Sequence, residues 1–155
     1  IRLKTFRISK DNYPEEALSF ENIDYLEIVK EDNWFDSRLY ELFTSRFLFA
    51  VFKEHIENAI SVFRLERCFF WTMPQKDLEA AEEYWTDIKK HVLRDEIDPK
   101  YFYKEGDGKK FHVRPKAQKA ANLSPTPSGT LAKRYCYWFN KSYVKEIVSK
   151  ELENK

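Results

Sequence analysis

The sequence predicts a mixed α/β domain in which a central mixed β-sheet is flanked by helices. Several apolar or alternating runs have the length of strands, whereas residues 78–92 repeat apolar side chains at spacings of three and four. Hydrophobic residues make up 43 % of the 155 residues, which is enough for one sizeable core. We therefore expect residues 1–155 to form a single domain.

The first half of the chain contains the strand-like segments. Residues 1–8 alternate between apolar and polar side chains, as in a half-buried strand, and residues 17–29 form a second strand-like stretch with a break near Asn22. Residues 46–53 form a continuous apolar run, which is typical of a strand buried on both faces. Residues 59–73 supply a partner strand that ends at Pro74.

The helices alternate with these strands. Residues 35–43 fit a short helix, residues 78–92 form an amphipathic helix, and Ser142 is the expected cap of a last helix. Residues 110–113 and 133–139 are expected to be strands, and residues 118–130 a long polar loop. The predicted order is β-β-α-β-β-α-β-β-α.

The composition excludes several classes of protein. The three glycines form no phosphate-binding loop, and no apolar run of about 18 residues exists, so we expect no membrane partner. Cys68 and Cys136 lie in apolar runs and are expected to be buried free thiols of a reducing, cytoplasmic compartment. Two cysteines and three histidines argue against a zinc site.

The charged residues are distributed unevenly along the chain. The net charge is +1, but residues 100–141 contain ten basic and two acidic residues and therefore carry +8, which leaves −7 elsewhere. Such a segment can present a cationic surface to a polyanion, although it also fits a solvated loop region. The basic residues of interest are Lys109, Lys110, Arg114, Lys116, Lys119, Arg134 and Lys141.

The segment 111–117 carries the candidate base-reading residue. Pro115 restricts the backbone and favours an extended conformation at Arg114. An arginine held in this way suits bidentate contact with guanine, whereas Lys116 and Lys119 suit phosphates. A surface strand end with solvated charges is the alternative interpretation.

The residues alone indicate no catalytic group. His112 has no readable serine or cysteine nucleophile near it, so we interpret it as a structural or DNA-facing histidine. The acidic cluster 79–83 is interpreted as the solvated face of a helix.

Five segments, taken in order, resemble the MutH family. This family joins the mismatch-repair endonuclease MutH to type II restriction endonucleases that cut at GATC. The likeness is to the C-terminal half of the larger, Sau-type enzymes, and it covers nearly the whole chain. The resembling segments are residues 2–5, 44–54, 70–74 together with the helix through Trp85 that follows, 112–117 and 136–143.

The resemblance implies a restriction-endonuclease-like fold and a C-terminal fragment of a longer enzyme, an expectation that also fits a chain starting inside a strand. The parent would be a type II site-specific deoxyribonuclease. The implied partners are double-stranded DNA, the N-terminal catalytic domain of the same polypeptide and, on DNA, a second copy. A bacterial cytoplasmic location is expected.

The resemblance also bears on catalysis. The family's nucleases use an Asp followed by Glu-x-Lys, and the two carboxylates hold Mg²⁺. Lys4 matches the lysine, but Arg2 occupies the Glu position, and the upstream Asp would precede Ile1. We therefore expect no catalytic residue, no metal and no cofactor in this chain, with Mg²⁺ serving the parent enzyme.

By the same resemblance, Arg114 takes the guanine-reading role, with Lys116 beside it in the groove. Trp138 falls where MutH places a tyrosine near the adenine, although it also fits a core position. The expected function is GATC-like DNA binding by a catalytically silent recognition or effector domain. Two alternatives stay open: an active nuclease with metal acids at Glu15, Glu16 or Asp24, and a purely structural domain.

Overall fold

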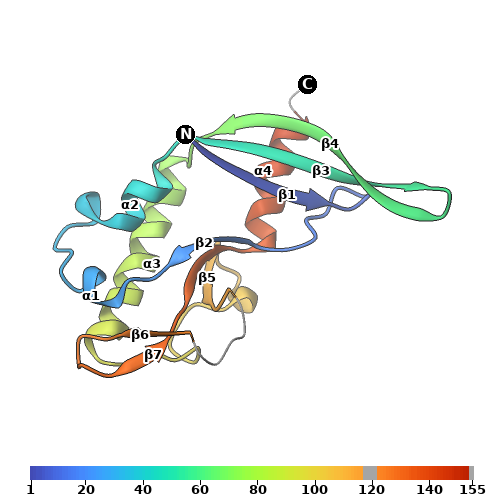
Figure 1. Ribbon diagram of the computed structural model, residues 1–155. Coiled ribbons are helices and arrows are strands. Elements are labelled where there is room, and N and C mark those ends of the chain that lie inside the picture. Colours follow the sequence, from blue (N-terminus) through green and yellow to red (C-terminus); the bar gives the residue numbers. More distant parts are fainter. Residues whose placement is uncertain (117–121, 154–155) are drawn as a thin grey trace. The chain divides into compact units, whose positions relative to one another are not determined.

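The computed structural model describes residues 1–116 and 122–153, and it confirms a mixed α/β fold (Figure 1). The chain divides into two compact units. Unit 1 comprises Ile1–Leu18, Ser45–Thr72 and Asn140–Lys155, and unit 2 comprises Ser19–Thr44 and Met73–Phe139. None of the described helices has the length and apolar character needed to cross a membrane.

Unit 1 is built on a three-stranded sheet in the order β1-β3-β4. The strand β1 (Arg2–Ile8) runs parallel to β3 (Phe47–Glu57), which pairs antiparallel with β4 (Ile60–Trp71). This sheet is therefore mixed, as predicted. The apolar run of β3 is buried at Phe47 and Phe49, but Leu48 and Phe52 on the other face are only half-buried.

A two-residue turn joins β3 to β4. Asn58 and Ala59 both have positive φ angles, 53° and 65°. Two successive residues with positive φ give a hairpin turn whose twist matches the flanking strands. Asparagine tolerates this conformation, whereas alanine does so only with strain.

Aromatic packing joins this sheet to the last helix, α4 (Lys141–Glu153). Phe49 contacts Phe6 and Trp71 with ring centroids 5.3 and 5.5 Å apart, and Trp71 contacts Tyr143 of α4 at 6.2 Å. The helix begins at Lys141 rather than at a Ser142 cap. The backbone amides of Tyr143 and Val144 instead donate to the carbonyl of Asn140, which starts the helical turn.

Unit 2 holds the other helices. These are α1 (Tyr25–Ile28), η1 (Trp34–Asp36), α2 (Arg38–Phe43), α3 (Gln75–Leu93) and η2 (Glu105–Asp107). The strand expected over 17–29 is confirmed only in its first part, because β2 (Leu18–Asn22) ends at the predicted break. Asp24 then starts α1, since its Oδ1 accepts from the backbone amides of Leu26 and Glu27.

The strands of unit 2 form two further sheets. The order of the larger sheet is β2-β8-β5, where β8 is Cys136–Phe139 and β5 is Phe111–Arg114. A hairpin of β6 (Leu123–Pro125) and β7 (Leu131–Lys133) replaces part of the expected loop. The described strands thus form separate small sheets instead of the one central sheet that was expected.

Four phenylalanines hold the centre of unit 2. Phe20 of β2 lies 4.5 Å from Phe139 of β8, and Phe43 of α2 lies 5.5 Å from Phe111 of β5, measured between ring centroids. The amphipathic helix α3 joins them through Tyr84, whose ring stacks on Phe111 at 5.2 Å. This packing fixes β5 and β8, the strands that carry the candidate site.

The two cysteines differ in their surroundings. Cys136 is buried, as expected, but Cys68 is exposed. The expectation failed for Cys68 because it lies on β4, an edge strand whose two faces are unequally covered.

Candidate nucleic-acid interface

The antiparallel pairing of β5 and β8 positions the candidate base-reading residue. His112 pairs with Trp138, and Arg114 pairs with Cys136 two residues further along. Side chains two residues apart on a strand share one face. The side chains of His112, Arg114 and Trp138 therefore gather on one face at the end of β5.

Trp138 supports Arg114 by two contacts. The guanidinium carbon of Arg114 lies 4.0 Å from the centroid of the Trp138 ring, which is cation–π geometry. The indole Nε1 of Trp138 donates to the backbone carbonyl of Arg114 at 2.9 Å. The same residue thus holds both the main chain and the charged end of Arg114.

The indole ring also packs against His112. Their ring centroids are 5.6 Å apart and their planes differ by 16°, so the rings are stacked. His112 is 1 % exposed and Trp138 is 8 % exposed. Both side chains are core residues in this structure, and neither presents a surface to DNA. They lie beneath Arg114 and support it.

Arg114 itself remains accessible. Its side chain is 43 % exposed, and its Nη1 lies 3.5 Å from Oε2 of Glu105. An ion pair of this length between exposed groups contributes little to stability and exchanges readily with solvent or another anion. Pro115 follows at a half-buried position, and the side chain of Lys116 is exposed.

Beside this strand end lies a small polar pocket of about 190 Å³. It is lined by Asn22, Lys116, Asn122 and Arg134. The backbone amide and Nε of Arg134 donate to the carbonyls of Asn122 and Leu123, at 3.0 and 3.1 Å. Arg134 is thereby ordered next to Lys116, so the two cations lie in one concave surface.

Cys136 contacts Asn22, one of the residues that line this pocket. Its Sγ donates to Oδ1 of Asn22 at 2.9 Å. Burial raises the pKa of the Cys136 thiol, and the nearby Lys116 opposes that rise only in part. The thiol is therefore a structural hydrogen-bond donor rather than a nucleophile.

The remaining predicted cations are distributed differently. Lys109 lies over the ring of Tyr103, with Nζ 4.6 Å from its centroid, and Nζ of Lys110 lies 3.6 Å from Oδ1 of the buried Asp77. Lys141 is exposed but belongs to unit 1. Lys119 lies outside the described residues.

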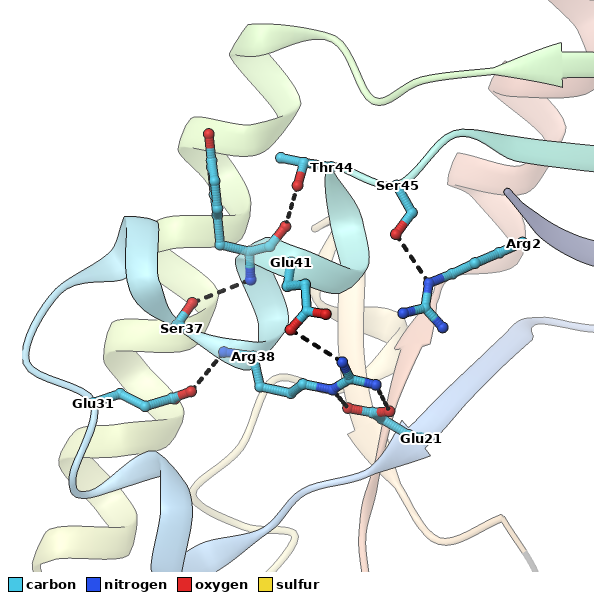
Figure 2. Close-up of polar contacts among 9 residues, drawn as sticks. Arg2, Glu21, Glu31, Ser37, Arg38, Glu41, Thr44 and Ser45 are labelled. Carbon is cyan, nitrogen blue, oxygen red and sulfur yellow. Dashed lines mark hydrogen bonds and ion pairs between the residues drawn. The ribbon is translucent and has the colours of Figure 1, made fainter.

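The residues matched to the family's catalytic strand lie on β1 of unit 1. Nε of Arg2 donates to Oγ of Ser45 at 2.9 Å, as Figure 2 shows. Lys4 is half-buried two residues along the same strand. The chain thus holds a fixed cation where the resemblance implies a metal-binding carboxylate.

The acids considered as alternative metal ligands belong to different units. Glu16 forms an ion pair with Arg7 at 3.8 Å in unit 1, Glu15 is exposed in the same unit, and Asp24 caps α1 in unit 2. Across residues 1–116 and 122–153, no three His, Cys, Asp or Glu side chains come together as a metal site.

Sequence reasoning missed three features of unit 2. Glu105 as the ion-pair partner of Arg114 comes from a separate 3₁₀ turn, which no pattern around Arg114 indicates. The hairpin β6–β7 was hidden by its short strands, although Gly129 with a φ of 87° was a usable turn signal. The third feature is an acidic hollow formed by residues 21–41 and Tyr137.

No protein-family model matches this chain, and no curated protein is significantly similar to it in sequence.

Proposed function

We propose that the chain binds double-stranded DNA through the surface of unit 2 around Arg114. The observation that best supports this proposal is the way in which Trp138 holds the side chain of Arg114. A guanidinium stacked on a buried indole has few orientations, yet its side chain is 43 % exposed. Rigid presentation of a planar donor set suits bidentate contact with the O6 and N7 atoms of guanine.

The neighbouring cations supply the complementary contacts to the DNA backbone. Lys116 and Arg134 share the polar pocket next to Arg114. Phosphate contacts by such side chains position a protein on the duplex, while the base contact specifies the sequence. When DNA binds, the guanidinium of Arg114 leaves the carboxylate of Glu105 and donates to a base edge instead.

The resemblance supports a more specific version of this proposal. In that version the chain is a catalytically silent MutH-like domain of a cytoplasmic type II restriction endonuclease. It binds a GATC-like site and acts as a recognition or effector domain for an N-terminal catalytic domain, which uses Mg²⁺. Arg2 at the position of the metal-binding Glu supports the silent assignment.

Fluorescence anisotropy with a GATC duplex and a scrambled duplex of equal length tests the proposal at stated salt concentrations. We expect the logarithm of the binding constant to fall with the logarithm of salt, by about 0.9 per phosphate contact. Arg114→Ala should weaken GATC binding by about 1–3 kcal/mol and reduce the preference over the scrambled duplex. Lys116→Ala should weaken both duplexes alike.

Arg94→Ala is the matched control. It removes an exposed arginine of the same unit at the end of α3, outside the Arg114 surface. Its binding should equal that of the unchanged protein. If Arg114→Ala weakened binding of both duplexes equally, Arg114 would contact only phosphates and would not read a base. An absence of salt-dependent binding would leave the purely structural domain as the function.

A further inference from the structure

The hairpin of β6 and β7 in unit 2 (Figure 1) has an exposed apolar face. Leu123 pairs with Lys133 and Pro125 pairs with Leu131, so these four side chains share one face of the two strands. Leu123 is 42 % exposed and Leu131 is 65 % exposed, and Pro125 is exposed as well. Three of the four residues on this face are therefore apolar and accessible to a partner.

Hydrogen bonds hold the tip of this hairpin. The backbone amide of Thr126 donates to the carbonyl of Thr130 at 2.9 Å, and the amide of Gly129 donates to the carbonyl of Thr126 at 3.0 Å. Oγ of Ser128 donates to Oδ1 of Asp95, a residue that follows α3, at 3.0 Å. The turn is thus tied to the end of the longest helix of unit 2.

The base of the hairpin is held as well. The hydroxyl of Tyr25 donates to the carbonyl of Lys133 at 2.5 Å and accepts from the backbone amide of Tyr135 at 3.2 Å. The amide of Arg134 donates to the carbonyl of Asn122 at 3.0 Å. Because both ends are fixed, the apolar face loses little conformational freedom when a partner covers it.

The charge around this face selects an anionic partner. Residues 108–145, which include the whole hairpin, contain no aspartate and no glutamate. Lys133 lies on the apolar face itself, and Arg134 shares the polar pocket with Lys116 at the base of the hairpin. A partner that complements this surface therefore offers negative charge together with apolar groups.

The major groove of duplex DNA offers this combination. It is bordered by phosphates and admits a two-stranded β-ribbon, and thymine presents there a C5 methyl group that apolar side chains can contact. The polar pocket joins Asn122 and Arg134 of the hairpin base to Lys116, which follows Arg114 by two residues. The hairpin thus adjoins the residue for which guanine contact in the same groove is proposed.

We propose that the β6–β7 hairpin enters the major groove and that Leu123 and Leu131 read thymine by contact with its methyl group. Lys133 and Arg134 contact the phosphates beside the groove. This inference rests on the proposed DNA-binding function and adds a second base-reading element to it. It complements the guanine contact of Arg114, since a GATC site contains one thymine on each strand.

Fluorescence anisotropy with two GATC duplexes tests this proposal, where deoxyuridine replaces the GATC thymidines in one of them. Uracil pairs as thymine does and lacks only the methyl group. We expect the unchanged protein to bind the deoxyuridine duplex about four- to fifteenfold more weakly, because apolar contact with one or two methyl groups is lost. Leu123→Ser combined with Leu131→Ser should weaken binding of the thymidine duplex by a similar factor and should bind the two duplexes alike.

Two further variants serve as controls. Leu123→Met combined with Leu131→Met keeps an apolar face and should keep the preference for the thymidine duplex. Phe35→Ser removes an exposed apolar side chain from η1 of the same unit, and its affinities should equal those of the unchanged protein. Circular dichroism should show that all variants keep the fold.

The thymine contact would be overturned if the unchanged protein bound both duplexes with equal affinity, or if the serine variant kept the full preference for the thymidine duplex. Either result would still include salt-dependent binding of the GATC duplex, so the DNA-binding proposal would stand. A chain that bound neither duplex would contradict both proposals.

Discussion

Trp138 and Arg114 show how a buried aromatic residue can control an exposed charge. The indole contacts the guanidinium at 4.0 Å and donates to the main chain of the same residue at 2.9 Å. A cation–π contact at a partly exposed site is worth about 0.5–1 kcal/mol. The indole thus limits the orientations of Arg114 while it is itself buried.

We expect Trp138→Leu to weaken binding of the GATC duplex by about two- to fivefold, because the face that carries Arg114 is lost. Trp138→Phe keeps an aromatic face and loses only the indole donor, so its binding should lie between that of Trp138→Leu and the unchanged protein. Fluorescence anisotropy measures both, with thermal unfolding as a check on the fold. Identical affinities for the two variants would show that the aromatic face has no role.

The two thiols provide a second prediction at the scale of single residues. Cys136 is fully buried, donates to Asn22 and has a raised pKa, whereas Cys68 is exposed on β4. Because the thiolate is the reactive form, Cys68 should be alkylated by iodoacetamide at pH 8 well before Cys136. Peptide mass spectrometry resolves the two sites. In urea both thiols should react at similar rates, and a difference that persisted there would contradict this explanation.

At the scale of elements, the start of α2 depends on one hydroxyl. Oγ of Ser37 accepts from the amide of Tyr40 at 3.1 Å (Figure 2). The same hydroxyl donates to the carbonyl of Trp34 at 2.7 Å, and the Ser37 side chain is buried. Ser37→Ala should lower the free energy of unfolding by about 1 kcal/mol, which urea denaturation measures. Ser37→Thr retains the hydroxyl and should lose less. Equal losses would exclude the capping role.

The turn between β3 and β4 contains a strained residue, Ala59, and a substitution there can relieve the strain. Ala59 has a φ of 65°, a conformation that an L-residue with a Cβ adopts at a cost of about 1–2 kcal/mol. Ala59→Gly should raise the free energy of unfolding by about 0.5–1 kcal/mol, after the greater freedom of glycine in the unfolded chain is subtracted. Asn58→Gly is the control and should change stability less, because asparagine already tolerates this region.

At the scale of the whole molecule, charge is separated within a chain whose total is +1. The +8 of residues 100–141 contributes the Arg114 surface, and residues 21–41 contribute the acidic hollow. The cation Arg2, fixed by Ser45, stands where the proposed MutH-like assignment places a metal-binding carboxylate. A cation at this position repels Mg²⁺.

We therefore expect the purified chain not to cleave GATC DNA in the presence of Mg²⁺ or Mn²⁺. A plasmid nicking assay measures this directly. Cleavage that survives repurification and is abolished by Lys4→Ala would show instead that this chain is a nuclease whose metal ligands come from other residues.

Periodicity predicted the long elements of this protein well. The helix α3 and the strands β1, β3 and β4 lie where the patterns of apolar residues indicate, because each element repeats its burial over several residues. The short elements were harder to predict from the sequence. Residues 25–28 are apolar enough for a strand, and only the capping carboxylate of Asp24 distinguishes them as the start of a helix.

By itself, the sequence determined the mixed α/β class, the long elements and the basic segment, since local spacing and composition carry all three. The guanine-reading role of Arg114 stays a prediction. The tertiary structure alone decided that His112 and Trp138 are buried supports, that Arg114 pairs with Glu105, and that Tyr137 lines an acidic hollow. Each of these facts joins residues more than five positions apart in the chain. Such contacts depend on strand register and on packing between elements, which a local pattern of side chains does not encode.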